Sequence, residues 1–273
     1  MAESLPGYIG QSVPRREDKH LLLGEGSFVA DIQFPNMLHV AIARSQLPHA
    51  TIEAVDLTAA RAAEGVALAI SGQDILGVLP PINGMQVVAP KGWRDGVRSD
   101  ILIPDQPLLP HDKLRYVGEP YALVVADNRY LAEDAMELIE PVLAPLPPVA
   151  GPADALKDDT CLLHDHLGRN ISAFLQAKMG EGADALKTAP HRLKRRFTHH
   201  RYAAMPLECR GVVADYDART DSLTIWSSTQ VVHWVRREVA NALGMPEERV
   251  RCIAPDVGGG FGGKGHVYPE DIL

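Results

Sequence analysis

The stretch "APDVGGGFGGKGHVYPEDIL", residues 254–273, decides how the rest of this sequence is interpreted. Within it, glycines at 258–260 and 262–263 surround Phe261 and lead to Lys264. Glycine has no Cβ, so a glycine-rich backbone can approach a neighbouring group closely. Three interpretations are open: the backbone meets a nucleotide phosphate, a larger cofactor, or no ligand.

A phosphate-binding P-loop is the first interpretation. Gly258 and Gly263 bracket four residues, and Lys264 follows them as that motif requires. The next residue must be Ser or Thr to hold magnesium, but it is Gly265. Without that hydroxyl, a nucleotide triphosphatase would lack a metal ligand.

A dinucleotide-binding fingerprint is the second interpretation. Gly258, Gly260 and Gly263 satisfy GxGxxG, and a strand-like run precedes them. The motif must open a helix and be followed about 20 residues later by an acidic residue. Pro269 breaks a helix here, so this interpretation fails as well. A flexible loop without a ligand also fits poorly, because so many glycines around one bulky Phe indicate close backbone approach.

Composition excludes several classes of protein. The 273 residues are 46% hydrophobic and 23% charged, which is ordinary for a globular protein. The net charge of -8 argues against nucleic acid as the main partner, and the basic cluster "HRLKRRF" at 191–197 alternates like one face of a strand. No apolar run approaches the ~20 residues of a membrane helix, so no membrane insertion is expected. The N-terminus lacks the apolar stretch of a signal peptide, which predicts a cytoplasmic protein.

The cysteines are not arranged to bind metal. Cys161, Cys209 and Cys252 are widely spaced and odd in number, and no CxxC pair exists. Neither a zinc site nor a cysteine-ligated iron–sulfur cluster can be built from them, so no metal ligands are predicted in this chain. Each cysteine is expected to be a small buried hydrophobic residue.

The first half of the chain mixes strands and helices. Strands are predicted at 37–44, 51–57, 66–72 and 121–126, with a helix at 59–64 capped by Thr58 and another from Asp127 or Asn128 to Pro141. Residues 76–110 are predicted to form a long excursion or a surface loop. The proline-rich tract 143–156 reads as a linker, and it places a domain boundary near residue 150, between domains 1–150 and 151–273.

The second half becomes regular after residue 190. Residues 191–202 are a strand candidate, and "GVVADYD" with "LTIWSST" predicts a hairpin. Apolar residues from Val232 to Leu243 recur at helical spacing, and Gly244 ends that helix. "RVRCIAP", at 249–255, is a further strand that leads into the glycine run. These elements predict an α+β fold.

Several ordered stretches resemble one known family. "VGGGFGGK", preceded by "SSTQ" at 227–230, resembles the molybdenum-cofactor subunit of the xanthine dehydrogenase, aldehyde oxidase and aerobic carbon monoxide dehydrogenase family. "RYVGEPYALVVADNRYLAEDAMELI" and "MPLECRGVVADYD" are similar to earlier parts of that subunit, as is "GQSVPRREDKHLLLGEGSFVADIQFPNMLHVAIARSQLPHATI". The resemblance covers nearly the whole chain and is weakest at 80–105 and 155–190. It implies a mixed-sheet, hammerhead-like N-terminal domain followed by the first part of a molybdopterin-binding α+β domain.

The resemblance also implies a cofactor site. In the family a pterin dithiolene holds the molybdenum, and the protein supplies hydrogen bonds around the metal's oxygen and sulfur ligands. By motif position, Gln230 would donate an amide hydrogen to an oxo ligand, and the backbone N–H groups of Phe261 and Gly262 would approach the cofactor. The remaining cofactor-binding residues implied by the motif are Gly259, Gly260, Gly263 and Lys264.

Other roles, most of them structural, are an alternative at several of these positions. Gln230 could instead bind backbone, and Phe261 could be a core anchor. Lys264 could meet a cofactor phosphate or lie in solvent. Glu208 and Arg210 are interpreted as a structural ion pair, and Glu119 as a turn residue.

The family's reaction is oxidative hydroxylation of a small-molecule substrate. Its general-base glutamate lies close to the C-terminus of a much longer subunit, so the resemblance places that residue beyond Leu273. No catalytic residue is therefore expected within this chain, and the chain alone is expected to be inactive.

The resemblance further implies a cofactor and partners. The cofactor is molybdenum molybdopterin, in the cytosine dinucleotide form. The partners carry the remaining half of the subunit, the 2Fe–2S clusters and the FAD. The alternative is a non-catalytic fragment or scaffold that only binds a partner subunit.

Overall fold

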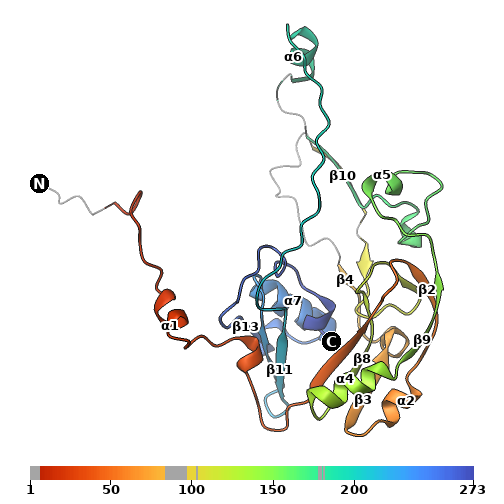
Figure 1. Ribbon diagram of the computed structural model, residues 1–273, viewed down its shortest axis with the longest axis vertical. Coiled ribbons are helices and arrows are strands. Elements are labelled where there is room, and N and C mark those ends of the chain that lie inside the picture. Colours follow the sequence, from red (N-terminus) through yellow and green to blue (C-terminus); the bar gives the residue numbers. More distant parts are fainter. Residues whose placement is uncertain (1–6, 84–96, 103, 178–179, 181) are drawn as a thin grey trace, which may run out of the picture.

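The computed structural model describes residues 7–83, 97–102, 104–177, 180 and 182–273 (Figure 1). Two small antiparallel sheets form its first part. In one, β8 (Pro120–Ala126) lies between β1 (His39–Arg44) and β3 (Val66–Ser71). In the other, β2 (Ala50–Asp56) lies between β7 (Lys113–Leu114) and β9 (Glu140–Pro145).

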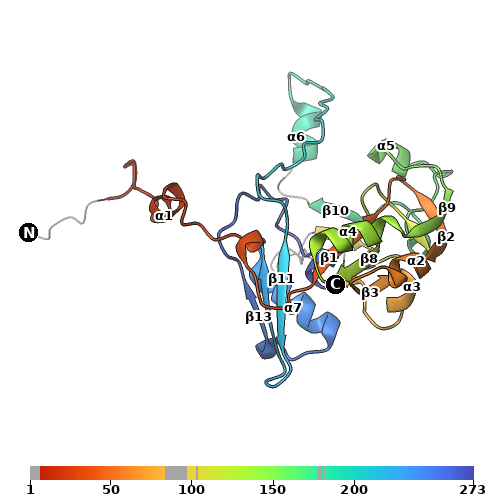
Figure 2. The same ribbon diagram turned by 60° about the horizontal axis from the view of Figure 1, so that its bottom comes forward.

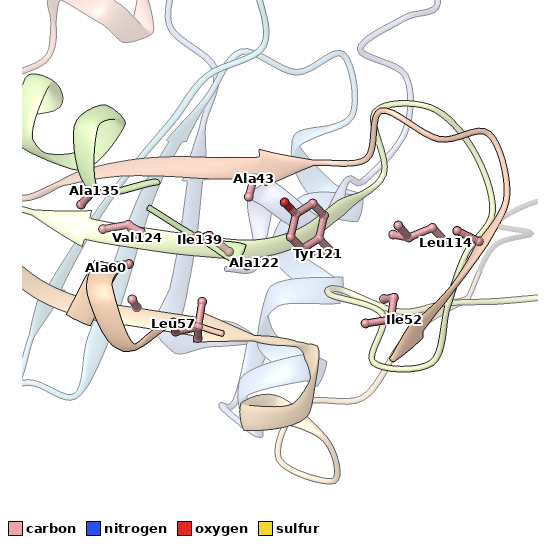
Figure 3. Packing of buried hydrophobic residues seen from close by; sticks show 12 residues of the cluster. Ala43, Ile52, Leu57, Ala60, Leu114, Tyr121, Ala122, Val124, Ala135 and Ile139 are labelled. Carbon is pink, nitrogen blue, oxygen red and sulfur yellow. The ribbon is translucent and has the colours of Figure 1, made fainter. Parts of the chain in front are cut away.

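The central position of β8 follows from its composition. A strand covered on both faces requires a continuous apolar run, and every residue of β8 except Val125 is buried. Figure 3 shows the cluster that β8 organises, with side chains from both sheets and from two helices. Its labelled members are Ala43, Ile52, Leu57, Ala60, Leu114, Tyr121, Ala122, Val124, Ala135 and Ile139.

Helices cover the first sheet. α4 (Arg129–Glu137) packs against β1 and β8, and it begins where the side-chain oxygen of Asn128 accepts the N–H of Leu131 at 3.0 Å. The predicted cap is therefore confirmed. α2 (Thr58–Ala62) begins differently from the prediction. Thr58 is its first residue, and Asp56 supplies the capping oxygen, 2.8 Å from the Thr58 nitrogen.

The second part of the chain is a three-stranded sheet with one covering helix (Figure 2). β11 (Val212–Asp217) and β12 (Ser222–Ser227) form the predicted antiparallel hairpin. α7 (Val232–Leu243) then crosses over to β13 (Val250–Ile253), which runs parallel to β12. Gly244, with φ of 63°, ends α7 as expected.

Short elements complete the described structure. A two-residue pair joins β4 (Ile82–Asn83) to β6 (Asp105–Gln106), and β5 (Val97–Ile101) pairs with β10 (Ala173–Ala177). The short helices are α1 (Asp18–Leu22), α3 (Gly72–Ile75), α5 (Pro152–Ala155), α6 (Gly182–Thr188), and the 3₁₀ turns Val29–Asp31, Asp165–Leu167, Glu247–Arg249 and Pro269–Asp271. The described residues contain no helix with the length and hydropathy of a membrane span.

The two parts of the chain contact each other directly. The rings of Phe34 and Trp226 lie 5.2 Å apart between centroids. Ser27 and Asp256 are joined by two hydrogen bonds. The Asp256 N–H donates to the Ser27 carbonyl at 3.0 Å, and the Ser27 N–H donates to the Asp256 carboxylate at 2.9 Å. The N-terminal arm is thereby tied to the chain just before the glycine run. The boundary near residue 150 stays a prediction.

Some sequence-based predictions are wrong. Residues 191–202 form no strand, since nothing in the described chain pairs with them. The prolines of 140–145 lie in β9, at the edge of its sheet, so the linker cannot begin at 143. Residues 76–110 are not merely a surface loop, because Leu108 and Leu109 are buried, although 84–96 and 103 lie outside the described residues. Cys209 is exposed, so it is no buried hydrophobic residue.

Candidate functional site

The glycine run and the "SSTQ" stretch meet at one edge of the second sheet. β12 ends at Ser227, three residues before Gln230, and the parallel strand β13 ends at Ile253, five residues before Gly258. Parallel neighbours deliver the residues after them to the same edge, which is where open α/β sheets bind ligands. The two motifs that suggested a cofactor site are therefore adjacent in space.

Gln230 is bound to the glycine run through its backbone and its side chain. The Gln230 N–H donates to the Lys264 carbonyl at 2.9 Å, and its side-chain Oε1 accepts the N–H groups of Gly262 at 3.1 Å and Lys264 at 3.3 Å. Because both partners are donors, the carbonyl oxygen must face the loop and the amide Nε2 must face away. The interpretation of Gln230 as a backbone-binding residue is confirmed for its oxygen, and its nitrogen stays available.

Two glycines of the run are required by the protein's own side chains. A Cβ on Gly260 would lie 2.6 Å from the Gln230 Oε1, and one on Gly258 would lie 2.5 Å from the Glu208 Cβ. Contacts this short are not tolerated without movement of the loop or its neighbours. Glycine is thus needed at these positions to seat the loop against Gln230 and Glu208.

The tip of the run is open and has an unusual backbone. Gly259, Phe261 and Gly262 have φ values of 96°, 49° and 85°. A Cβ on Gly262 would meet nothing within 4 Å. Glycine is favoured there by the positive φ of the backbone and not by a lack of space for a side chain. Phe261 is 79% exposed, and its interpretation as a core anchor is wrong.

Lys264 lies inside the protein. It is 1% exposed, and its ammonium donates to the Glu208 Oε2 at 2.7 Å and contacts the Ser228 Oγ at 2.7 Å. Its interpretation as a solvated lysine is wrong. The expected contact with a cofactor phosphate would require the ammonium to leave both of these partners.

Glu208 gathers three donors on a single oxygen. Its Oε2 accepts from Lys264, from the Ser228 hydroxyl at 2.5 Å and from the Gly258 N–H at 2.8 Å. Burial alone would raise the pKa of Glu208, but these hydrogen bonds outweigh it and hold the pKa below its usual value. Its Oε1 is buried and has no donor in the described part of the chain.

The expected ion pair between Glu208 and Arg210 does not form. Arg210 contacts Glu270 instead, at 3.1 Å, and its guanidinium lies 3.6 Å over the ring of Tyr268. Glu270 also binds Arg44 of β1 at 2.5 Å. Residues two apart in an extended segment point to the same side, so their spacing suggested that Glu208 and Arg210 would pair. Their contacts with Lys264 and Glu270 instead turn the two side chains toward different partners.

The last turn of the chain lies beside these residues. The 3₁₀ turn Pro269–Asp271 carries Glu270, and the Leu273 N–H donates to the Pro269 carbonyl at 2.9 Å, which continues the turn. Leu273 is itself only partly buried. The position of the general-base glutamate beyond Leu273, and with it the expectation that this chain holds no catalytic residue, stays a prediction.

Other candidate residues have structural roles. Glu119 is 3% exposed and accepts the Arg115 N–H at 2.5 Å, and burial raises its pKa to about 7. The residues described by the structure contain no group of three His, Cys, Asp or Glu side chains that could hold a metal ion.

Sequence reasoning missed the residues behind the loop. Ser228 lies in the "SSTQ" stretch, but the sequence assigned it no role. The sequence also did not predict the ion pair between Lys264 and Glu208. The two charges are 56 residues apart, and no spacing rule joins them. Tyr268, whose hydroxyl donates to the Gly263 carbonyl at 2.7 Å, was missed for the same reason.

Comparison with known proteins identifies two domains in this chain. Residues 163–273 match the molybdopterin cofactor-binding domain, and residues 23–147 match the a/b hammerhead domain of aldehyde oxidase and xanthine dehydrogenase. Together the two domains account for most of the chain.

Similar proteins are longer than this chain. The chain is 36% identical to the nicotine 6-hydroxylase large subunit of Paenarthrobacter nicotinovorans, over 97% of this chain and 31% of that protein. It is 33% identical to the carbon monoxide dehydrogenase large chain of Afipia carboxidovorans, over 98% of this chain and 33% of that protein. It superposes on quinoline 2-oxidoreductase from Pseudomonas putida 86 with a TM-score of 0.83 and 37% identity, over 97% of this chain and 32% of that one.

A hammerhead domain followed by a molybdopterin cofactor-binding domain, with the glycine run at a sheet edge, defines the class of this protein by its domains. The chain belongs to the xanthine dehydrogenase, aldehyde oxidase and carbon monoxide dehydrogenase family of large subunits. It spans about a third of the length of the relatives named above.

Proposed function

We propose that this chain forms one wall of a molybdopterin site and works in a multisubunit molybdenum hydroxylase. The observation that carries the proposal is a set of unused hydrogen-bond donors on one loop. No acceptor in the described part of the chain takes the N–H groups of Gly259, Gly260 or Phe261, or the side-chain nitrogen of Gln230. Donors fixed in advance around a position where negative charge develops are a main source of enzymatic rate enhancement.

These residues fit an oxygen-rich, anionic group. Successive N–H groups with positive-φ residues among them form a concave donor surface that suits anions. The donor set therefore suits a molybdenum cofactor with its oxo ligands and phosphate.

Each residue has a distinct role in this site. Gln230 donates through Nε2 while its Oε1 anchors the loop, and Phe261 presents an exposed ring beside it. Lys264 and Glu208 act as positioning residues, since their ion pair holds the loop from behind. When bound, the cofactor supplies two-electron oxidation of a substrate carbon, with oxygen taken from water.

The rest of the activity is proposed from the relatives. Their names describe a large subunit and a subunit of a complex, which supports work within an assembly. We place the general-base glutamate beyond Leu273. We place three further features in parts of the assembly that these 273 residues do not include: the contacts to the cytosine dinucleotide, the 2Fe–2S clusters and the FAD. The substrate class is a small molecule.

Two substitutions at Gln230 test the proposal in the assembly that contains this chain. Gln230→Glu keeps an oxygen facing the loop and removes the outward donor, whereas Gln230→Ala removes both. We expect the wild type to contain molybdenum and pterin, measured by plasma mass spectrometry and by fluorescence of the oxidised pterin. Gln230→Glu should retain the pterin and lose about 100-fold in turnover, as loss of a preorganised donor does, and Gln230→Ala should lose cofactor as well.

The control is Gln73→Ala, which changes an exposed glutamine of α3 in the first part of the chain. An assembly without molybdenum and pterin would contradict the proposal and favour a non-catalytic scaffold. Unchanged turnover in Gln230→Glu would remove Gln230 from the site.

A further inference from the structure

The segment 191–202, which we call the basic arm, leads from α6 toward β11 without forming any regular structure. In Figures 1 and 2 it runs as an extended ribbon between these two elements. All of its residues are exposed, and none of its backbone groups forms a hydrogen bond within the described chain. An extended backbone with open N–H and C=O groups is a template for pairing with another strand.

The side chains of the basic arm also form no hydrogen bond or ion pair within the described residues. Its sequence, "HRLKRRFTHHRY", holds lysine and arginine but no acidic residue. None of these cations forms an ion pair within the described residues, although the chain as a whole carries a net charge of -8. Leu193 and Phe197 are 83% and 82% exposed.

The arm has the period of a strand. In an extended chain, alternate residues lie on opposite faces. Arg192, Lys194 and Arg196 then share one face, and Leu193, Arg195 and Phe197 share the other. The sequence pattern that predicts a strand is thus present, but its neighbour in a sheet is not within the part of the chain that the structure describes.

From the open backbone, the unpaired charge and this alternation, we propose that the basic arm adds as a β-strand to the edge of a partner sheet. The partner strand carries Asp or Glu opposite Arg192, Lys194 and Arg196, and apolar side chains opposite Leu193 and Phe197. Backbone pairing of this kind supplies affinity, and alternate side chains supply specificity. The partner lies in the part of the molybdenum subunit that these residues do not include, so the inference rests on the proposed function in that respect.

The arm's position makes this pairing relevant to the cofactor site. A few residues after it, Ala204 and Pro206 lie against the glycine run, within 3.2 Å of the places where Cβ atoms on Gly263 and Gly259 would be. The arm therefore continues directly into the wall of the site. Docking of the arm and ordering of the loop are expected to be linked.

Hydrogen exchange of the assembly containing this chain is the first test. Amides of 191–202 should be protected in the assembly and should exchange freely in this chain alone. The second test is a proline scan over 193–198, because only alternate N–H groups of an edge strand face its neighbour. The first set of variants is Leu193→Pro, Arg195→Pro and Phe197→Pro, and the second is Lys194→Pro, Arg196→Pro and Thr198→Pro. Each variant of one set should weaken association about tenfold, and each variant of the other should change it less than about twofold.

Charge reversal tests the acidic partner. Arg196→Glu should weaken association several-fold at low salt, and the loss should shrink as salt rises. Arg251→Glu is the matched control, since Arg251 is exposed and lies outside the arm. The proline variants should leave the thermal unfolding of the isolated chain unchanged, because the arm forms no backbone hydrogen bonds within its described residues.

The outcomes separate this inference from the proposed function. Unprotected amides in the assembly, or equal effects of both proline sets, would overturn the strand pairing even if molybdenum is bound. Protection and an alternating effect without molybdenum would support the pairing and contradict the proposed function. Tight binding of a labelled 20-nucleotide RNA, abolished by Arg196→Glu, would overturn the pairing in favour of a nucleic-acid arm.

Discussion

The ammonium of Lys264 lies 2.7 Å from the carboxylate of Glu208, and the lysine is 1% exposed. This pair joins the end of the glycine run to the segment that precedes β11. It stands directly behind the loop whose open face carries the unused donors. The conformation of the loop therefore depends on a buried charge pair as well as on its glycines.

Removal of one charge of this pair should destabilise the protein. Lys264→Met leaves the Glu208 carboxylate without its cation, so the free energy of unfolding should fall by about 3 kcal/mol in urea titrations. The double variant Glu208→Gln/Lys264→Met should lose less than the sum of the single variants. Lys187→Met is the control, because its exposed pair with Asp184 should contribute under about 0.5 kcal/mol. Additive losses in the double variant would argue against coupling.

A single methyl group in the glycine run should displace Gln230. Gly260→Ala places a Cβ 2.6 Å from the Gln230 Oε1, so we expect a loss of about 1–3 kcal/mol and a fall in molybdenum content of the assembly. Gly182→Ala is the control, since a Cβ there meets nothing within 4 Å. Wild-type molybdenum content in Gly260→Ala would show that the position of Gln230 is unimportant for the cofactor.

Glu119 should make stability depend on pH in a defined direction. Burial raises its pKa from 4.5 to about 7, so the folded state holds this proton more tightly than the unfolded state. Its contribution is fully present below pH 4.5 and is lost as pH rises through about 7, which amounts to about 3 kcal/mol. Unfolding of Glu119→Gln, measured from pH 5 to 8, should lack this decline. An identical slope in both proteins would assign the pH dependence to another group.

Glu270 should hold the two parts of the chain together. Glu270→Ala leaves the Arg44 and Arg210 guanidinium groups without their shared carboxylate, and we expect a loss of about 2 kcal/mol and faster proteolysis between the two parts. Burial alone would raise the pKa of Glu270, but Arg210 and Arg44 outweigh it and lower the pKa. Its stabilisation is thus present at neutral pH and lost as pH falls through the folded-state pKa. Glu133→Ala is the control, because it removes an exposed helical ion pair with Arg129. An equal loss of unfolding free energy in both variants would show that Glu270 does not join the two parts of the chain.

Local patterns predicted the elements with strong internal signals. The apolar run of β8, the hairpin of β11 and β12, and the periodic face of α7 were all confirmed, because burial of such residues follows from their spacing. The same reasoning was wrong for 191–202, where the alternation is genuine but no neighbouring strand exists within the described chain. A strand's pattern specifies a face, whereas pairing requires a second backbone.

The sequence by itself determined the family, the elements with strong internal patterns such as β8, the β11–β12 hairpin and α7, and the two motifs that meet at the candidate site. Only the tertiary structure decided that Gln230 turns its oxygen toward Gly262 and Lys264, and that Glu208 binds Lys264 and not Arg210. These contacts join residues 32, 34 and 56 positions apart. Their geometry depends on which strands the sheet places side by side, and that is a property of the packed chain and not of any local pattern.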